Sequence, residues 1–484
     1  MYWRALAAMS SGLISIILAV QPVYAESNET PGRPSGSRPP ASPVGDPVLH
    51  WNALALQANA EDHSGTFGAP QQGGPGPSSR ALAIVHAAVF DAVNSIDGSY
   101  RPYLTRVRLE RGAHASIDAA VATAAHDTLT ALYPAQQAVF DDAWRRHLAL
   151  LRASSARDLG VQIGRKVAER LLASRRNDGA NAVPDHTASD LPGRHRVDPF
   201  HPSQGYLGPH WGAVRPFVIR NGAQFRSPPP PLLHSRAYAE AFNDAKRLGG
   251  NGVETATQRT VEQTEIGLYW AYDGGPGLGT PPRLYNQITR AIAEQMSNTV
   301  VENARLFALV NLAQADAGIA CWESKYYYDF WRPVLGIQEA DRGTGPTGEG
   351  DHNRDTRGDT HWHYLGAPAS NQIAGNFTPP FPAYPSGHAT FGAATFESIA
   401  LFYGTDDIPF TFTSDELNGL TTDNQGTVRP LSPRSYLRLS DAAAENAQSR
   451  IYLGIHWQFD ATEGIVMGSR VANYVFRNAL RPAR

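Results

Sequence analysis

The last third of the 484-residue sequence holds three short blocks whose residue types suit the binding of a tetrahedral oxyanion. In chain order they are 325–333 (KYYYDFWRP), 385–388 (PSGH) and 449–460 (SRIYLGIHWQFD). Together they supply three cations, a hydroxyl group, a glycine N–H and two imidazoles, from Lys325, Arg332, Ser386, Gly387, His388, Arg450 and His456. Fixed positive charge and N–H or O–H donors stabilise an oxyanion, and imidazoles can transfer protons. A simple metal cation would instead require carboxylates or thiolates.

Lys325 and Arg332 could reach one anion from a single helix. They are seven residues apart, which is two helical turns, so they would face nearly the same way with about 10.5 Å of rise between them. Pro333 would end or kink that helix directly after Arg332. The alternative is a pair of solvated surface cations. Against it, the segment is too aromatic for an exposed face, with Trp322, Tyr326, Phe330 and Trp331 nearby.

The second block precedes a predicted helix over residues 389–403. A helix N-terminus presents unpaired N–H groups and the positive end of the helix dipole, and both suit an anion. Ser386 can donate its hydroxyl proton, and Gly387 allows the backbone to approach closely. His388 would then lie beside the anion as a proton donor or acceptor. Ser386 could instead serve only as the N-cap of the helix, although the two roles are compatible.

The third block must bend to bring its side chains together. Arg450 and His456 are six residues apart and do not share a helical face. Two explanations are open: Gly454 between them lets the backbone break, or the Arg450 side chain wraps around the helix. His456 and Asp460 are four residues apart and would share a face. Asp460 is therefore a candidate to orient His456, with an ordinary surface acid as the alternative.

In this order and spacing the three blocks resemble the superfamily of vanadium-dependent haloperoxidases and type 2 phosphatidic acid and acid phosphatases. The superfamily signature is Lys, six residues, Arg-Pro; then Pro-Ser-Gly-His; then Ser-Arg, five residues, His, three residues, Asp. Every one of these positions matches. One departure is the connection of 60 residues (389–448) between the second and third blocks, which is longer than in compact phosphatases. Its length favours the larger haloperoxidase branch.

The resemblance implies a vanadate cofactor and a role for each matching residue. His456 would bond the vanadium, or attack phosphorus in a phosphatase, and His388 would be the acid–base residue. The equatorial oxygens would be neutralised by three cations, Lys325, Arg332 and Arg450. They would also accept hydrogen bonds from Ser386 and Gly387. Lys325 would also polarise the peroxide, so the implied catalytic set is Lys325, His388 and His456. The implied partners are hydrogen peroxide and halide, with a small organic substrate left open.

Three further residues resemble parts of the haloperoxidase site. Trp322 and Phe381 occupy positions that also hold Trp and Phe in chloroperoxidase-type members, whereas algal bromoperoxidases have His at the Phe position. Asp273, in the segment YWAYDG, resembles the carboxylate that pairs with the last Arg of the site. The alternative for Asp273 is a cap on the turn before Gly274 and Gly275.

Two other functions use the same residues. A soluble acid phosphatase would employ His456 as nucleophile through a phosphohistidine intermediate, with His388 protonating the leaving group. A phosphate- or vanadate-binding protein without turnover would need the cations and donors but no proton shuttle, so His388 counts against it. The length of the chain and the Trp322 and Phe381 matches favour a haloperoxidase over both.

Residues 1–25 have the features of a secretory signal peptide, with cleavage predicted after Ala25. Arg4 supplies the positive charge, and residues 6–20 form the apolar segment. The protein is therefore expected to be secreted or periplasmic. It is also expected to be soluble, because no later segment offers ~18 uninterrupted apolar residues. A formal net charge of −3 gives no electrostatic support for a nucleic-acid or membrane partner.

Helical periodicity is frequent and no useful strand pattern is present, so an all-α fold is predicted. A disordered lead-in rich in Pro and Ser is predicted over 26–48, an N-terminal helical part over 49–235, and a C-terminal helical part with the site over 236–484. Predicted helices cover 80–96, 115–132, 135–151, 155–174, 236–247, 255–268, 284–294, 298–322 and 389–403. The resemblance further implies two four-helix-bundle type cores with long loops, and the anion site between helices. Cys321, the only cysteine, is expected to be a buried thiol.

Overall fold

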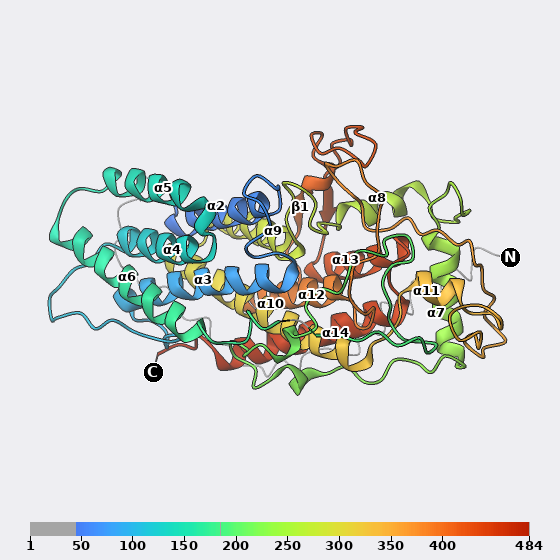
Figure 1. Ribbon diagram of the computed structural model, residues 1–484. Helices are drawn as coiled ribbons and strands as arrows, with labels where there is room; N and C mark the ends of the chain where they lie inside the picture. Colours follow the sequence, from blue (N-terminus) through green and yellow to red (C-terminus); the bar gives the residue numbers. More distant parts are fainter. Residues whose placement is uncertain (1–44, 184, 484) are drawn as a thin grey trace. The chain divides into compact units, whose positions relative to one another are not determined.

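Helices form most of the computed structural model, which describes residues 45–183 and 185–483 (Figure 1). The α-helices are α2 (Pro47–Asp62), α3 (Pro75–Asp97), α4 (Ile117–Leu132), α5 (Gln137–Leu150), α6 (Ser155–Arg175), α7 (Arg236–Gly249), α8 (Val261–Tyr269), α9 (Pro281–Gln295), α10 (Val300–Tyr328), α11 (Pro333–Gln338), α12 (Gly387–Tyr403), α13 (Leu439–Tyr452) and α14 (Gln458–Asn478). Short 3-10 helices are η1 (Pro134–Gln136), η2 (Trp211–Ala213), η3 (Gly222–Phe225) and η4 (Asp415–Leu417). Within the described residues the only sheet pairs β1 (Phe410–Phe412) with β2 (Arg434–Tyr436) in antiparallel register. The all-α prediction is confirmed.

Capping residues place several helix starts. Ser or Thr side chains accept backbone N–H groups at the N-termini of α4, α6, α7, α8, α10 and α12. Helix α8 was predicted to start at residue 255, but Thr260 and Gln263 form a capping box that begins it at Val261. Helix α2 begins at Pro47, inside the predicted lead-in. The predicted signal peptide and the lead-in up to residue 44 lie outside the described residues.

Glycines allow two pairs of helices to pack backbone against backbone. Gly164 of α6 faces α4, where an added Cβ atom would lie 2.5 Å from the carbonyl oxygen of Ala120. Gly468 of α14 faces α12, where an added Cβ would lie 2.3 Å from the carbonyl oxygen of Thr390. A larger side chain at either glycine would push the helices apart. The spacing between α12 and α14 matters most here, because both helices carry site residues.

Helix α10 packs between helices from the first part of the chain and helices from the last part. The former include α2 and α3, and the latter include α12 and α14. It is 29 residues long and buried over most of its length, and Cys321 within it is fully buried, as predicted. The division of the chain between residues 235 and 236 stays a prediction.

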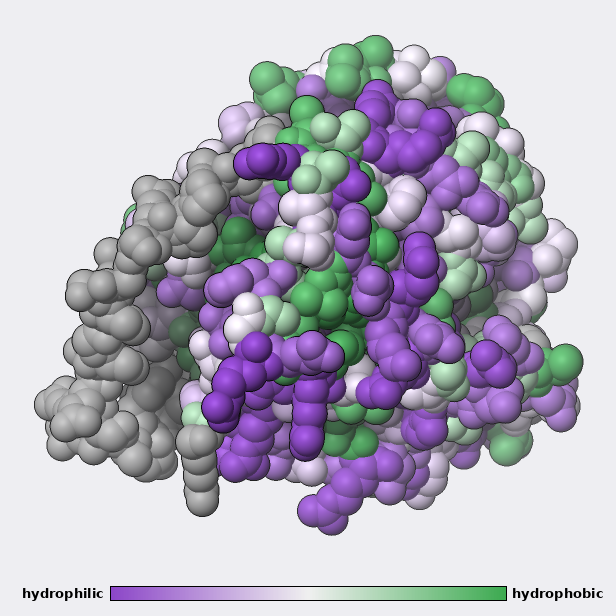
Figure 2. Space-filling view, turned by 90° about the vertical axis from the view of Figure 1, so that its left-hand side faces the viewer, coloured by the Kyte–Doolittle hydropathy of each residue, from purple (hydrophilic) through white to green (hydrophobic). Residues whose placement is uncertain are grey.

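The surface carries the polar faces of these helices. Figure 2 views the side on which α5 and α6 lie in Figure 1, and shows mainly hydrophilic side chains with small hydrophobic patches between them. In the described part of the chain, no helix combines the length and the apolar character needed to cross a membrane.

Candidate active site

The three sequence blocks meet where α10 ends, α12 begins and α13 passes into α14. Nζ of Lys325, on α10, donates hydrogen bonds to the carbonyl oxygens of Pro382 (2.8 Å) and Ala383 (2.9 Å), just before the second block. The N–H of Ser386 donates to the carbonyl oxygen of Asp460 on α14 at 2.9 Å. The second block and the residues just before it are therefore hydrogen-bonded to both of the other blocks.

Arg332 reaches the site from extended backbone and not from a helix. The expectation that Lys325 and Arg332 share one helix is wrong, because Asp329 caps α10 in the left-handed conformation (φ 51°). Asp is among the few non-glycine residues that adopt this conformation readily. The turn carries Arg332 into the third block, where Nη1 lies 2.8 Å from the carbonyl oxygen of Ile455 and 2.9 Å from Nε2 of His456.

The second block lies at the N-terminus of α12, which was predicted to start at residue 389 and begins at Gly387, inside the block. Ser386 is the N-cap, and its Oγ accepts the N–H of Ala389 over a long 3.4 Å. Its hydroxyl proton remains available for donation to an anion. Nε2 of His388 lies 2.5 Å from the carbonyl oxygen of Ala271. Because a carbonyl can only accept, Nε2 carries a proton, and in the neutral ring the lone pair is on Nδ1.

Asp273 binds Arg450 at the end of α13. Nη2 of Arg450 donates to both carboxylate oxygens, at 2.9 and 2.8 Å. The same carboxylate lies 3.9 Å from Nε2 of His388. Beyond Arg450 the chain turns at Gly454, whose φ is 72°, so His456 lies in the junction between the two helices. Of the two alternatives, the structure has the break of the backbone at Gly454.

Asp460 determines which ring nitrogen of His456 carries the proton. Its Oδ2 accepts from Nδ1 of His456 at 2.8 Å and from the N–H of Trp457 at 3.0 Å. Nε2 of His456 is therefore unprotonated and accepts the Arg332 hydrogen bond, and an unprotonated ring nitrogen is the form in which histidine bonds a metal. The spacing had suggested that His456 and Asp460 share one helical face. Instead His456 precedes α14, and the contact spans the start of that helix.

Burial governs the titration of these groups. Burial lowers the pKa of Lys325 to about 7 and that of Arg332 to about 9. Burial, reinforced by the neighbouring guanidinium groups, lowers the pKa of His388 to about 3 and that of His456 well below its ordinary value. Both imidazoles are therefore neutral near pH 7. Burial also raises the pKa of Asp460 to about 7. The site thus concentrates cationic side chains where water stabilises them poorly.

The unpaired donors of the site fit a tetrahedral oxyanion. Among the described residues, Nη2 of Arg332 and both Nε and Nη1 of Arg450 are buried without a hydrogen-bond partner. Buried charged donors without partners are costly, and an oxyanion would satisfy them with charge-assisted hydrogen bonds. With the Nε2 lone pair of His456 beside them, this donor set suits vanadate as well as phosphate. It does not suit a simple cation.

A cavity of about 240 Å³ adjoins these residues. Its lining includes Asp273, Gly387, His388, Arg450 and His456, together with apolar residues among which are Leu207, Phe377, Pro379 and Pro380. Trp322 and Phe381 form part of the same wall, with ring centres 4.8 Å apart. Nζ of Lys325 lies 5.0 Å from the centre of the Phe381 ring. The structure therefore brings every site residue predicted from the sequence into one region.

Sequence reasoning missed the cavity residues that lie far from the blocks. Gln204 and Leu207 come from residues 175–235, where no helix was predicted, and His63 follows the last residue of α2. The Ala271 carbonyl that binds His388 has no side-chain signal at all. Only its neighbour Asp273, in the YWAYDG segment, indicated that this stretch belongs to the site.

Comparison with known proteins identifies the family. A family model described as the vanadium chloroperoxidase N-terminal domain matches residues 40–204, and one described as the VCPO second helical-bundle domain matches residues 305–484. The vanadium chloroperoxidase of Curvularia inaequalis is 35% identical over an alignment covering 86% of this chain and 79% of that protein.

Solved structures show the same fold. A bacterial vanadium-dependent iodoperoxidase superposes with a TM-score of 0.70 at 20% identity, covering 91% of this chain and 97% of the other. A holo-type bacterial vanadium-dependent chloroperoxidase superposes with a TM-score of 0.64 at 16% identity, covering 88% and 97%. Taken with the oxyanion-binding geometry of the site, these similarities show that the chain belongs to the vanadium-dependent haloperoxidases, enzymes whose cofactor is vanadate.

Proposed function

We propose that the protein oxidises halide with hydrogen peroxide to hypohalous acid at the site formed by the three blocks. The single observation that carries the proposal is the set of three unpaired guanidinium nitrogens, from Arg332 and Arg450, near the unprotonated Nε2 of His456. When bound there, vanadate would supply a Lewis acid that activates hydrogen peroxide without a redox change at the metal. Every other part of the chemistry falls to the residues of the chain.

The cations and the second block hold and orient the anion. Arg332 and Arg450 each keep at least one buried N–H free to bind an oxyanion oxygen. Lys325 uses two donors on backbone carbonyls, so a third proton of its ammonium group is left for the anion or for a bound peroxide oxygen. Ser386 would donate its hydroxyl proton, and Gly387 its backbone N–H at the start of α12.

His456 would hold the metal, because Asp460 keeps the proton on Nδ1 and leaves Nε2 unprotonated. Arg332 donates to that nitrogen at 2.9 Å, so metal binding would release this donor toward an oxyanion oxygen. Asp460 acts only through His456 and is a positioning residue.

His388 is the proposed acceptor of the proton that hydrogen peroxide loses. Its ring is neutral near pH 7, its Nε2 is fixed on the Ala271 carbonyl, and its Nδ1 lone pair is the proton acceptor on a ring that lines the cavity. A neutral imidazole can take the proton that hydrogen peroxide loses and return it when hypohalous acid forms. The Asp273 carboxylate, 3.9 Å from Nε2, would stabilise the protonated ring.

Trp322 and Phe381 are the proposed halide contacts. Their rings lie beside the ammonium group of Lys325, which is 5.7 and 5.0 Å from the two ring centres. The positive edges of aromatic rings and a nearby ammonium group both attract a large, weakly hydrated anion. The acid phosphatase alternative is not favoured by the comparisons, whose named proteins are haloperoxidases.

The direct test is halogenation of a phenolic dye by the purified protein. The protein is first stripped of bound anion and then assayed with peroxide and halide, with and without added orthovanadate. We expect dye halogenation only with vanadate. Turnover of p-nitrophenyl phosphate without dye halogenation would refute the proposal and restore the phosphatase assignment.

We also propose that the protein is exported through the signal peptide at residues 1–25. N-terminal sequencing of protein recovered outside the cytoplasm of the producing cell should begin at Glu26 if cleavage follows Ala25. A mature chain that retains residues 1–25 in the cytoplasm would contradict export.

A further inference from the structure

Tyr272 separates two groups that contact the site, and its backbone conformation is unusual. On one side the Ala271 carbonyl accepts Nε2 of His388, and on the other the Asp273 carboxylate binds Arg450. Tyr272 itself has a φ of 48°, in the left-handed region that bulky side chains rarely adopt. Such a conformation persists only where surrounding contacts impose it. The positions of both neighbours therefore depend on whatever holds Tyr272.

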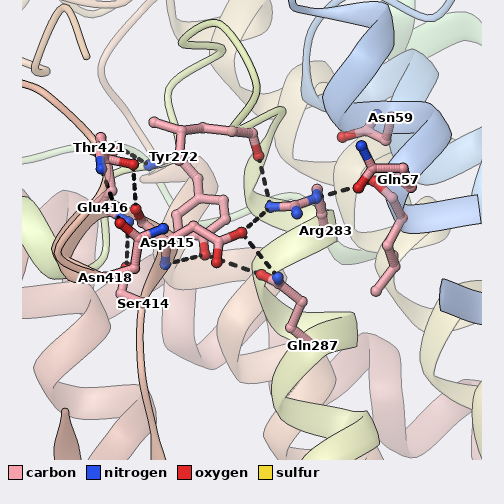
Figure 3. Close-up of polar contacts among 12 residues, drawn as sticks. Gln57, Asn59, Tyr272, Arg283, Gln287, Ser414, Asp415, Glu416, Asn418 and Thr421 are labelled. Atoms are coloured by element: carbon pink, nitrogen blue, oxygen red, sulfur yellow. Dashed lines mark hydrogen bonds and ion pairs between the residues drawn. The ribbon is translucent and has the colours of Figure 1, made fainter. Parts of the chain in front are cut away.

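Two residues that hold Tyr272 come from the connection between α12 and α13, which lies within the long separation of the second and third blocks (Figure 3). The N–H of Tyr272 donates to Oε1 of Glu416 at 3.1 Å. The Tyr272 hydroxyl accepts the N–H of Asp415 at 2.7 Å and donates to Oε1 of Gln287 at 3.0 Å. Glu416 thus binds the backbone of Tyr272 while Asp415 fixes the far end of its side chain.

Glu416 is itself fixed on the side away from Tyr272. It is 1% exposed, and its Oε2 accepts hydrogen bonds from Oγ of Ser370 at 2.6 Å and from Nη1 of Arg429. Arg429 also donates to Ser370 at 2.9 Å. One carboxylate oxygen is therefore committed to this buried pair, and the other is committed to the Tyr272 N–H.

Asp415 has a separate support on α9. Its Oδ2 accepts from Nη1 of Arg283 at 2.6 Å and from Nε2 of Gln287 at 3.0 Å. Arg283 in turn donates to the carbonyl oxygen of Leu56 on α2 at 3.0 Å. Figure 3 shows these side chains as one row from the α12–α13 connection to α2. The row ties Tyr272 to α9 and α2, which carry none of the proposed anion-binding residues.

We propose that Glu416, with Asp415 beside it, is a positioning residue for the haloperoxidase site. Acting through Tyr272, it sets the Ala271 carbonyl against His388 and the Asp273 carboxylate against Arg450. This inference rests on the proposed function. It gives the connection between α12 and α13 a role, because that connection supplies Asp415 and Glu416. Through Tyr272 these two residues support the ion pair of Asp273 with Arg450. Loss of Glu416 should impair vanadate binding and turnover without removing any group that touches the anion.

The test compares two substitutions of Glu416 in the full-length protein. Glu416→Ala removes both the charge and the acceptor for the Tyr272 N–H, whereas Glu416→Gln removes the charge but keeps an acceptor oxygen. Binding of orthovanadate is measured by calorimetry, and halide oxidation is measured per bound vanadium. We expect Glu416→Ala to raise the vanadate Kd by about 10- to 100-fold, as loss of an outer hydrogen-bonding partner does at other metal sites. Glu416→Gln should recover most of that loss.

Asp178→Ala is the matched control. Asp178 is also a buried carboxylate that binds arginines, Arg80 and Arg175, and accepts a backbone N–H, but it is absent from the cavity lining. It should lower the unfolding temperature and leave the vanadate Kd unchanged. If Glu416→Ala does not fold, Tyr272→Phe provides the test, because it removes the hydroxyl anchor without touching a charge. That variant should raise the Kd at least threefold.

The outcomes distinguish a failure of the proposed function from a failure of the positioning role of Glu416. A wild-type protein that binds no vanadate refutes the proposed function itself. A functional wild type refutes the positioning role in any of three cases: Glu416→Ala binds vanadate like wild type, Glu416→Gln is no better than Glu416→Ala, or Asp178→Ala weakens binding equally. An unchanged Kd in Tyr272→Phe refutes it where Glu416→Ala is unfolded.

Discussion

Replacing Asp460 with Ala should weaken vanadate binding by about 10- to 100-fold, although Asp460 makes no contact with the anion. Its Oδ2 holds the Nδ1 proton of His456 at 2.8 Å, and the side chain is fully buried. Without the carboxylate, the His456 ring can rotate and adopt either tautomer, so Nε2 presents its lone pair for only part of the time. The expected loss corresponds to about 1.4–2.8 kcal/mol of binding free energy.

A second substitution separates the effect of losing the orientation of His456 from the effect of losing the negative charge of Asp460. In Asp460→Asn the amide oxygen can still accept the Nδ1 proton, so the orientation of His456 should survive while the negative charge is lost. We therefore expect Asp460→Asn to bind vanadate more tightly than Asp460→Ala. The N–H of Trp457, which also donates to Oδ2, should keep an acceptor in the Asn variant.

The assay is titration of orthovanadate into the anion-free protein, followed by calorimetry and by recovered halide oxidation. Thermal unfolding of each variant without vanadate reports any damage to the start of α14. Because Asp460 acts through His456, Asp460→Ala should have no further effect in a His456→Ala background, as a double-mutant cycle would show. A wild-type vanadate Kd in Asp460→Ala, or additive losses in the cycle, would refute the reasoning.

Four further outcomes are expected. His388→Ala should still bind vanadate, yet lose about 10²–10⁴-fold in halide oxidation per bound vanadium, measured on one sample. Arg450→Ala should mainly raise the vanadate Kd, seen by calorimetry, because the bond to the histidine remains. Millimolar phosphate should slow reconstitution by vanadate, because three cations cannot separate the two anions by charge. Burial lowers the pKa of His126, but its hydrogen bonds to Asp127 and Asp141 raise it more, for a net increase. Its stabilisation is complete below the ordinary pKa of about 6.5 and is lost as the pH rises through the raised value. The difference in unfolding free energy between wild type and His126→Ala, from denaturant titrations, should shrink accordingly.

Features set by neighbouring residues were predictable from the sequence. The helix after the second block was predicted from residue 389 and begins two residues earlier, at Gly387, with Ser386 as its N-cap. Gly454 indicated a possible break of the backbone, which the structure has between α13 and α14. The helix predicted to join Lys325 and Arg332 was wrong, because the spacing of two cations does not reveal that Asp329 takes a left-handed conformation between them. Local pattern therefore located the site but not the path of its backbone.

Contacts between distant segments were beyond the sequence. The Ala271 carbonyl binds His388 from 117 positions away, and a carbonyl group is common to all residues. Glu416 and Arg429 form a buried ion pair, but nothing in the sequence distinguishes them from exposed charged residues. Asp273 was found only through its resemblance to a family segment, because nothing local connects it with Arg450. Such partners are defined by packing, which the spacing of residues along the chain does not encode.

The scarcity of exposed sulfur has a consequence for an enzyme whose proposed product is a strong oxidant. The sequence holds one cysteine and four methionines. Among the described residues, Cys321 and Met467 are buried and Met296 is the exposed sulfur, at 41%. Oxidation of sulfur follows exposure, and Met296 lies at the end of α9, outside the buried core. The fold also has no disulfide to be broken or exchanged. Among the sulfur-containing residues that the structure describes, continuous turnover should therefore oxidise Met296 before Met467 and Cys321, as mass spectrometry can follow.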